Sequence, residues 1–267
     1  MLKIYTFAHK RPDFVELQIK SFNKYLQEPF EFTVFNTANF DVFSRATLDS
    51  NYNEIHRICK YYNLACIDVE RDQELVNKHQ GYEPVPIFSP NRELGNPCIA
   101  CAYPLCWGWD NFISKQNGSI LILDSDMFLF QSVTFTDLLN KYQIYYVPQN
   151  SDGIEYMWNG IVLADLSNLP DLGMINWFCG NIKGNIPVDV GGQTYRYLET
   201  HPDLKKHYIG QENVWDDPEL DFHPSDYQTL WLEDRAVLHY RRGSNWLYRD
   251  YEYHRNKTIW LIDKLAL

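Results

Sequence analysis

The sequence predicts an α/β fold in which helices flank a mostly parallel, Rossmann-like sheet. Residues 119–123 form an apolar run without polar alternation, which is typical of a strand buried on both faces. Strand-like and helix-like segments alternate from residue 2 to residue 69, and this alternation builds a doubly wound parallel sheet. Because we find neither an internal repeat nor an interdomain linker, we expect residues 1–267 to form a single domain.

The N-terminal half contains the most regular elements. Pro12 opens the first helix, because a proline suits the first helical turn. Residues 71–97 are polar and proline-rich, so we expect a long loop there, and Pro104 is expected to kink the helix that follows. The expected strands are residues 2–8, 30–35, 64–69 and 119–124, and the expected helices are residues 12–26, 51–63 and 98–115.

The C-terminal half has shorter segments. Asn159 and Gly160 are expected to form the entry into one of its strands, and residues 176–193 are rich in Gly and Asn. The last helix is amphipathic and is expected to cover the core with Ile259, Trp260, Ile262 and Leu265. The expected strands are residues 145–148, 157–163 and 237–240, and the expected helices are residues 137–141, 194–201 and 250–267.

Two carboxylates follow the buried strand. Asp124 and Asp126 point the same way around Ser125 if the chain stays extended, because side chains alternate along a strand. Like charges on one face repel, and a divalent cation such as Mg²⁺ or Mn²⁺ removes the conflict. The carboxyl ends of strands are also where open α/β sheets bind ligands. The alternative is that either residue is a plain turn former or helix N-cap.

Composition excludes several classes of protein. The net charge of -11 argues against nucleic acid as a partner, and no Gly-x-Gly-x-x-Gly or P-loop motif supports a dinucleotide or NTPase site. Met1 is followed at once by a strand-like run, and no apolar stretch is long enough for a membrane span, so we expect neither a signal peptide nor a transmembrane segment. The six cysteines lack zinc-finger spacing, and we interpret them as reduced, mostly buried thiols of a cytoplasmic protein.

Four places in the sequence, taken together and in this order, resemble the GT-A glycosyltransferases, metal-dependent enzymes that use nucleoside-diphosphate sugars. They are Leu123–Met127, Trp158–Leu163, His239 with Gly243 and Trp246 behind it, and the N-terminal β-α-β segment with Thr6, Ala8 and Asn36. The nearest resemblance is to the family 8 type that includes glycogenin. Two features depart from that family. The Lys expected after the His is absent, so Arg241, Arg242 or Asn245 must replace it, and residues 189–193 stand in place of a Gly-Asp-Gln-Asp element.

The resemblance implies a single GT-A domain that transfers a hexosyl or pentosyl group. Residues 1–130 would bind the sugar nucleotide, with a UDP-sugar as the expected donor. Residues 131–267 would bind a saccharide or glycoconjugate acceptor and carry the C-terminal metal- and diphosphate-binding loop and helix. Such a chain can also form a homo-oligomer.

The resemblance also implies a role for individual residues. The metal ligands would be Asp124, Asp126 and His239, and an imidazole beside hard oxygens favours Mn²⁺, with Mg²⁺ as the alternative. Asp189 would be the catalytic candidate, and the acceptor or sugar contacts would be Asn159, Gly160 and Asp189. The sugar-nucleotide contacts would be Thr6, Ala8, His9, Arg11, Asn36, Asp124, Ser125, Arg241, Arg242, Gly243, Asn245 and Trp246.

Other interpretations stay open at this point. His239 can be a strand histidine bonded to the backbone, and Asn159 and Asp189 can be turn residues. A non-catalytic module could keep a sugar-nucleotide pocket without turnover. Phosphatases with a carboxylate nucleophile also have an Asp-x-Asp motif directly after a strand. Their motif is followed two residues later by Thr or Val, and this sequence has Phe128 there.

Overall fold

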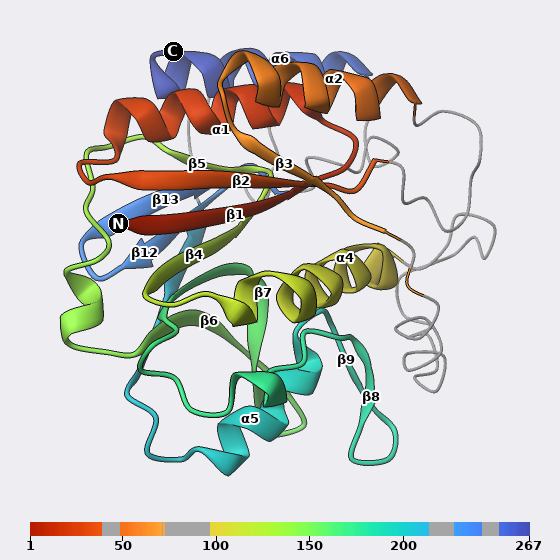
Figure 1. The fold of residues 1–267 in the computed structure, drawn as a ribbon, viewed down its shortest axis with the longest axis vertical. Coiled ribbons are helices and arrows are strands. Elements are labelled where there is room, and N and C mark those ends of the chain that lie inside the picture. The colour runs from red at the N-terminus through yellow and green to blue at the C-terminus, as the bar shows by residue number, and fades with distance from the viewer. Residues whose placement is uncertain (39–48, 71, 73–96, 214–226, 242–250) are drawn as a thin grey trace.

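A computed structural model describes residues 1–38, 49–70, 72, 97–213, 227–241 and 251–267. The expected loop at residues 71–97 falls almost entirely outside the described residues. The structure is mixed α/β, and a central sheet is covered by helices on both faces (Figure 1). The predicted fold class is therefore confirmed.

The central sheet has seven strands in the order β10-β6-β7-β4-β1-β2-β3. All of its strands run in one direction except β7, which is antiparallel to both β4 and β6. The strands are β1 (Leu2–Ala8), β2 (Phe30–Asn36), β3 (Ala65–Asp68), β4 (Ser119–Asp124), β6 (Ile144–Ser151), β7 (Ile154–Asp165) and β10 (Lys206–Tyr208). Because β1, β2 and β4 are parallel neighbours, their carboxyl ends meet at one edge of the sheet.

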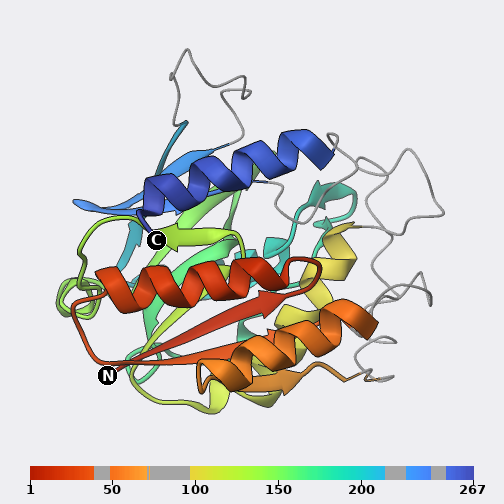
Figure 2. The same cartoon turned by 90° about the horizontal axis from the view of Figure 1, so that it is seen from above.

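Helices α1, α2 and α6 lie side by side in one layer (Figures 1 and 2). In this layer α1 and α2 cover one face of the central sheet, and α4 covers the other face. The α-helices are α1 (Pro12–Tyr25), α2 (Asp49–Tyr61), α4 (Pro97–Asn111), α5 (Tyr195–Thr200) and α6 (Tyr251–Leu265). Short 3₁₀ helices are η3 (Ile113–Lys115), η4 (Leu138–Asn140), η5 (Leu172–Met174) and η6 (Gly192–Thr194). The expected helices at residues 98–115 and 137–141 are thus shorter in the structure, and Pro104 lies inside α4.

Alternation along β1 explains why the sheet has a core on each face. Ile4 and Ala8 pack with the side chains of α1 and α2, whereas Tyr5 and Phe7 pack toward α4. β4 is buried on both sides over Ile120–Leu123, as its unbroken apolar run predicts. The two cores therefore fix β4, and with it the position of the carboxylates at its end.

A second, four-stranded sheet forms beside the first, in the order β11-β12-β13-β5, and all of its pairings are antiparallel. Its strands are β5 (Met127–Leu129), β11 (Gly210–Asn213), β12 (Gln228–Leu232) and β13 (Arg235–His239). A separate hairpin contains β8 (Gly180–Ile182) and β9 (Ile186–Val188). Only β13 was expected from the sequence. β5, β8, β9 and β11 have three or four residues, too few to show a clear alternation, and the sequence analysis did not identify β12.

The prediction that Asn159 and Gly160 enter a strand is wrong. Both residues lie inside β7, which is joined to β6 by the turn at Asp152 and Gly153. These two turn residues have φ values of 50° and 82°, the left-handed conformation that a two-residue hairpin of type I′ requires. The Asp-Gly pair was therefore the real turn signal in this part of the chain.

A third core lies beneath α6 and joins the second sheet to α1. Phe128 of β5 is fully buried there, and its ring meets the ring of Phe14 edge-on with centroids 5.4 Å apart. Leu261 and Leu265 cover this core from α6. Ile259, which was expected to face the core, is 48% exposed, so the apolar face of α6 is centred on Leu261 instead.

Replacing Phe128 by Ala should test how much this third core contributes to stability. We expect Phe128→Ala to lower the free energy of unfolding by about 3–5 kcal/mol, because a large buried side chain leaves a cavity. Phe130, which packs only partly against the same core, is the matched control, and Phe130→Ala should cost about 1 kcal/mol. Urea unfolding followed by circular dichroism measures both values. Equal losses in the two variants would contradict the assignment.

Candidate functional site

The turn between β4 and β5 presents the two carboxylates predicted to bind metal. β4 ends at Asp124, Ser125 and Asp126 form the turn, and β5 begins at Met127. Gln18 of α1 is fully buried, and its amide donates to the carbonyl oxygens of Asp124 at 2.9 Å and Met127 at 3.0 Å. Because these bonds fasten both ends of the turn to α1, the carboxylates project from a fixed backbone. The sequence analysis did not identify Gln18.

Antiparallel pairing of β5 with β13 brings His239 to this turn. His239 lies opposite Met127, and the N–H of Tyr240 donates to the carbonyl oxygen of Asp126 at 2.8 Å. As a result, Nε2 of His239 lies 3.5 Å from Oδ1 of Asp126. The exposed fraction is 8% for the histidine side chain and 13% for the aspartate side chain, so solvent reaches little of the pair.

Asp124, Asp126 and His239 fit a divalent cation. One ligand atom of each residue lies within 4.8 Å of the other two. Two carboxylates and an imidazole are donors that Mn²⁺ accepts, and Mg²⁺ accepts the oxygens. Nδ1 of His239 is buried and has no hydrogen-bond partner among the described residues, so no such bond fixes the ring's tautomer.

The site is electrostatically strained without a cation. Burial raises the pKa of Asp124 to about 8, and the negative charges of Asp126 and Asp189 add to this effect. Asn159 donates to Oδ1 of Asp124 at 3.4 Å, a long hydrogen bond that offsets little of the repulsion. The conflict between like charges that the sequence predicts is therefore present in the folded site.

β7 supplies the neighbouring wall through Trp158, Asn159 and Gly160. The ring of Trp158 lies 5.5 Å from the ring of His239, measured between centroids. A Cβ atom on Gly160 would lie 2.1 Å from that tryptophan ring, so a larger residue would displace the indole of Trp158. We conclude that Gly160 is required here because the indole folds back over the strand.

Asp189 lies close enough to Asp124 to influence its titration. Its Oδ1 accepts hydrogen bonds from the main-chain N–H of Val190 at 2.8 Å and from the Cys98 thiol at 3.2 Å. Burial, and then the charge of Asp189, raise the pKa of this thiol, which therefore remains a donor. Gly191 has a φ of 89°, and a Cβ atom on it would lie 2.0 Å from the carbonyl oxygen of Met157, so this close approach needs glycine.

The cysteines follow the prediction that most of their thiols are buried. Cys59, Cys98, Cys106 and Cys179 are buried, but Cys66 is half-buried and Cys101 is exposed. The C-x-x-C spacing did mark Cys98, whose contact with Asp189 could not be inferred from the sequence.

The residues near the ends of β1 and β2 that were predicted to contact a nucleotide are buried or form hydrogen bonds within the protein. Thr6 and Ala8 are fully buried, and Nδ1 of His9 lies 3.0 Å from the carbonyl oxygen of Thr37. The side-chain amide of fully buried Asn36 donates to the carbonyl oxygen of Tyr52 at 3.3 Å, and its oxygen accepts from the N–H of Ala38 at 3.1 Å. These residues shape the strand ends, and their contact with a nucleotide stays a prediction.

Arg11 is directed into the protein. Its guanidinium pairs with Asp13 at 2.5 Å, donates to Thr258 of α6 at 3.1 Å and stacks 3.7 Å from the centroid of the Phe14 ring. The side chain is 3% exposed, so these contacts link α1 to α6 and leave little surface for a phosphate.

The chain after β13 is anchored by a buried lysine of α6. Lys257 is 1% exposed, and its ammonium donates to the carbonyl oxygens of Tyr240 at 2.8 Å and Arg241 at 3.0 Å. The ammonium also lies 3.7 Å from the centroid of the Tyr240 ring. Arg241 is described, whereas the other predicted residues of this loop, Arg242, Gly243, Asn245 and Trp246, lie outside the described residues.

Among the described helices, none is long and apolar enough to cross a membrane.

Comparison with known proteins gave matches in structure only. No protein-family profile matches the chain, and no curated protein matches it in sequence. The galactosyltransferase LgtC, solved in complex with donor and acceptor sugar analogues, is 14% identical with a TM-score of 0.45, and the match covers 99% of this chain and 95% of that one. Mouse xyloside xylosyltransferase 1 in its apo form is 10% identical with a TM-score of 0.44, and the match covers 78% of this chain and 84% of that one. With TM-scores below 0.5, we draw no function from these likenesses.

The pKa of Asp124 predicts how the stability of the metal-free protein depends on pH. In the unfolded chain this carboxyl titrates near pH 4, so between roughly pH 4 and pH 8 the folded state holds the extra proton. The free energy of unfolding should therefore fall as the pH rises through this window. Asp124→Asn should remove this slope and stabilise the protein at pH 8 by on the order of 2 kcal/mol.

Urea unfolding in EDTA at several pH values measures the effect. Asp152→Asn is the matched control, because this residue lies in an exposed turn that accepts Asn equally well. The same pH slope in Asp124→Asn and in the control would rule out the assigned titration.

Proposed function

We propose that this chain is a GT-A-type glycosyltransferase that moves a sugar from a nucleoside-diphosphate donor to a hydroxyl group of a saccharide or glycoconjugate. The observation that carries this proposal is the convergence of Asp124, Asp126 and His239, which come from distant parts of the sequence to one end of β4. A UDP-sugar is the donor that we infer, as in the family 8 type that the sequence resembles.

Asp124, Asp126 and His239 would hold Mn²⁺ or Mg²⁺ in this proposal. A bound divalent cation supplies positive charge that stabilises the diphosphate leaving group as the glycosidic bond breaks. The protein's own contribution is rigidity. Gln18 fixes the turn that carries both carboxylates, and the pairing of β5 with β13 fixes the imidazole opposite them.

The donor would lie along the carboxyl ends of β1, β2 and β4, with its diphosphate toward the segment that starts at Arg241. A phosphate group needs cationic or N–H donors, and in this chain 35 acidic residues outnumber 24 Lys and Arg. Lys257 does not serve as this donor, because its ammonium already binds two carbonyl oxygens. Its role would be to hold the start of the loop, so that Arg241 and the residues after it meet the diphosphate.

The transferred sugar and the acceptor would lie between Asn159, Gly160 and Asp189. Asn159 contacts Asp124 directly, and Asp189 acts on the same carboxylate through its charge, so both residues lie beside the proposed metal ligands. Residues 1–130 would then bind mainly the donor and residues 131–267 the acceptor. Because the nearest sequence resemblance is to retaining enzymes, we favour Asp189 as an acceptor or sugar contact over a general base.

Metal dependence is the main test of this proposal. With a panel of UDP-sugars, we expect Mn²⁺-dependent thermal stabilisation of the protein and Mn²⁺-dependent release of UDP, both abolished by EDTA. Asp126→Asn keeps the shape of the side chain but loses a charged ligand, and should lower the rate on the order of 100-fold or more. Asp152→Asn should behave like the unmodified protein.

The alternatives have different outcomes in the same experiment. Stabilisation by UDP-sugars without release of UDP would indicate a non-catalytic binding module. Full activity of Asp126→Asn in EDTA would exclude the metal assignment.

Asp189→Asn separates an acceptor contact from a general base. As a contact, Asp189 can be replaced at a cost of roughly tenfold in rate, the size of one lost hydrogen bond to a charged group. A base would lose nearly all turnover while the affinity for the nucleotide stayed intact. Proton NMR of the product from a donor of known anomeric configuration shows which anomer forms. An inverted anomer together with an inactive Asp189→Asn variant would assign Asp189 as the base.

A further inference from the structure

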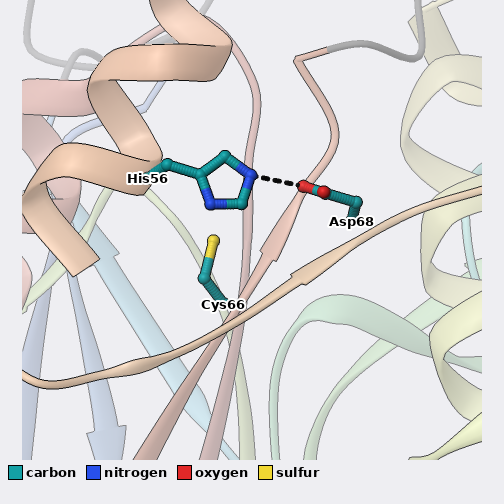
Figure 3. A group of neighbouring side chains, drawn as sticks. All are labelled: His56, Cys66 and Asp68. Carbon is teal, nitrogen blue, oxygen red and sulfur yellow. Dashed lines mark hydrogen bonds and ion pairs between the residues drawn. The ribbon is translucent and has the colours of Figure 1, made fainter. Parts of the chain in front are cut away.

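A second cluster of ligand-type side chains lies at the far edge of the central sheet, between α2 and β3. It contains His56 of α2 and Cys66 and Asp68 of β3, and one ligand atom of each lies within 4.8 Å of the other two (Figure 3). Cys66 and Asp68 are two residues apart on one strand, so they face the same side of the sheet, where α2 presents His56.

The three side chains already interact. Nε2 of His56 and Oδ1 of Asp68 are 2.8 Å apart. Figure 3 shows the imidazole with the carboxylate on one side and the Cys66 thiol below the ring. The exposed fraction is 37% for the histidine side chain and 35% for the aspartate side chain, so an ion from solvent can reach them.

Neighbouring residues orient the two β3 side chains. The hydroxyl of Tyr52 donates to Oδ2 of Asp68 at 2.6 Å, which leaves Oδ1 toward His56. The Cys59 thiol donates a hydrogen bond to the sulfur of Cys66. Hydrogen bonds of this kind fix the direction and the basicity of metal ligands.

This cluster is separate from the one at Asp124. In the strand register, Asp68 lies beside Asn36, Asn36 lies beside Ala8, and β1 lies beside β4. Three strand spacings place Asp68 about 14 Å from the end of β4, too far for one ion to bridge the two clusters.

We propose that His56, Cys66 and Asp68 form a zinc site, with water as the fourth ligand. A set of one imidazole nitrogen, one thiolate and one carboxylate suits Zn²⁺, whereas Mg²⁺ and Mn²⁺ prefer sites built of oxygen. Tetrahedral zinc places its ligand atoms about 3.4 Å apart, so the pair of His56 and Asp68 opens by about half an ångström when the ion replaces the proton between them. The thiol of Cys66 releases its proton to solvent on binding.

The bound ion would join α2 to β3. β3 is a four-residue strand at the edge of the central sheet, where only β2 pairs with it in the described part of the chain. An ion held by both elements would add stability to this edge, independently of catalysis at the other cluster.

Cobalt is the probe that distinguishes this site from the carboxylate site. When Co²⁺ is titrated into the metal-stripped full-length protein, we expect a near-ultraviolet charge-transfer band, because only a thiolate ligand produces one. Zn²⁺ should bleach the band by displacing Co²⁺. Cys66→Ser should abolish the band, and Asp68→Asn and His56→Gln should each weaken Co²⁺ binding tenfold or more.

Two variants serve as matched controls. Asp126→Asn should keep the band, because it alters only the other cluster. Cys101→Ser should keep it because Cys101 lies on α4, which covers the face of the central sheet opposite α2. Far-ultraviolet circular dichroism checks that each variant is folded, and if Cys66→Ser is not, the loss of affinity in Asp68→Asn and His56→Gln decides. Absence of the band in the unmodified protein, its persistence in folded Cys66→Ser, or its loss in Cys101→Ser would overturn the proposal.

Discussion

The pairing of β5 with β13 is the interaction on which the candidate site depends. β5 has only three residues, and it follows the turn that carries Asp126. Its pairing places His239 opposite Met127 and bonds the N–H of Tyr240 to the carbonyl oxygen of Asp126. Without it, the imidazole and the carboxylates would belong to different parts of the molecule. The third core under α6 holds this pairing in place, because Phe128 of β5 and Leu238 of β13 both pack into it.

The site shows how a fold can hold charges that oppose its stability. Burial and two neighbouring carboxylates raise the pKa of Asp124, and the only described amide that bonds its side chain, from Asn159, does so over a long distance. The surrounding structure bears this cost through apolar packing on both faces of β4 and through Gln18, which satisfies main-chain carbonyl groups but leaves the carboxylates unneutralised. Such an arrangement favours any ligand that brings positive charge, which is why these side chains are the centre of the proposed function.

The sequence predicted what local patterns determine. The apolar run to Asp124 and the N-terminal alternation identified six elements, β1, α1, β2, α2, β3 and β4, because a strand buried on both faces can be recognised from its own apolar residues. The roles of Arg11 and Gln18 were not predictable, since each depends on an element distant in the chain, Thr258 in one case and the β4–β5 turn in the other. Asn159 and Gly160 misled the prediction, because Gly160 is set by the indole of Trp158 rather than by a turn.

The buried ammonium of Lys257 has a consequence for how the protein matures. It belongs to the last helix, yet it holds the main chain directly after His239 by binding the carbonyl oxygens of Tyr240 and Arg241. During synthesis the N-terminal strands and α1 emerge first and can assemble while the rest of the chain is still missing. The β4–β5 turn would then carry its carboxylates before β13 and α6 are present. The contacts of these later elements span a large sequence separation and form late. A ribosome-bound chain without α6 would carry the acidic half of the site and lack the element that anchors its histidine strand, so the site would become competent to bind a ligand only after α6 has joined the fold.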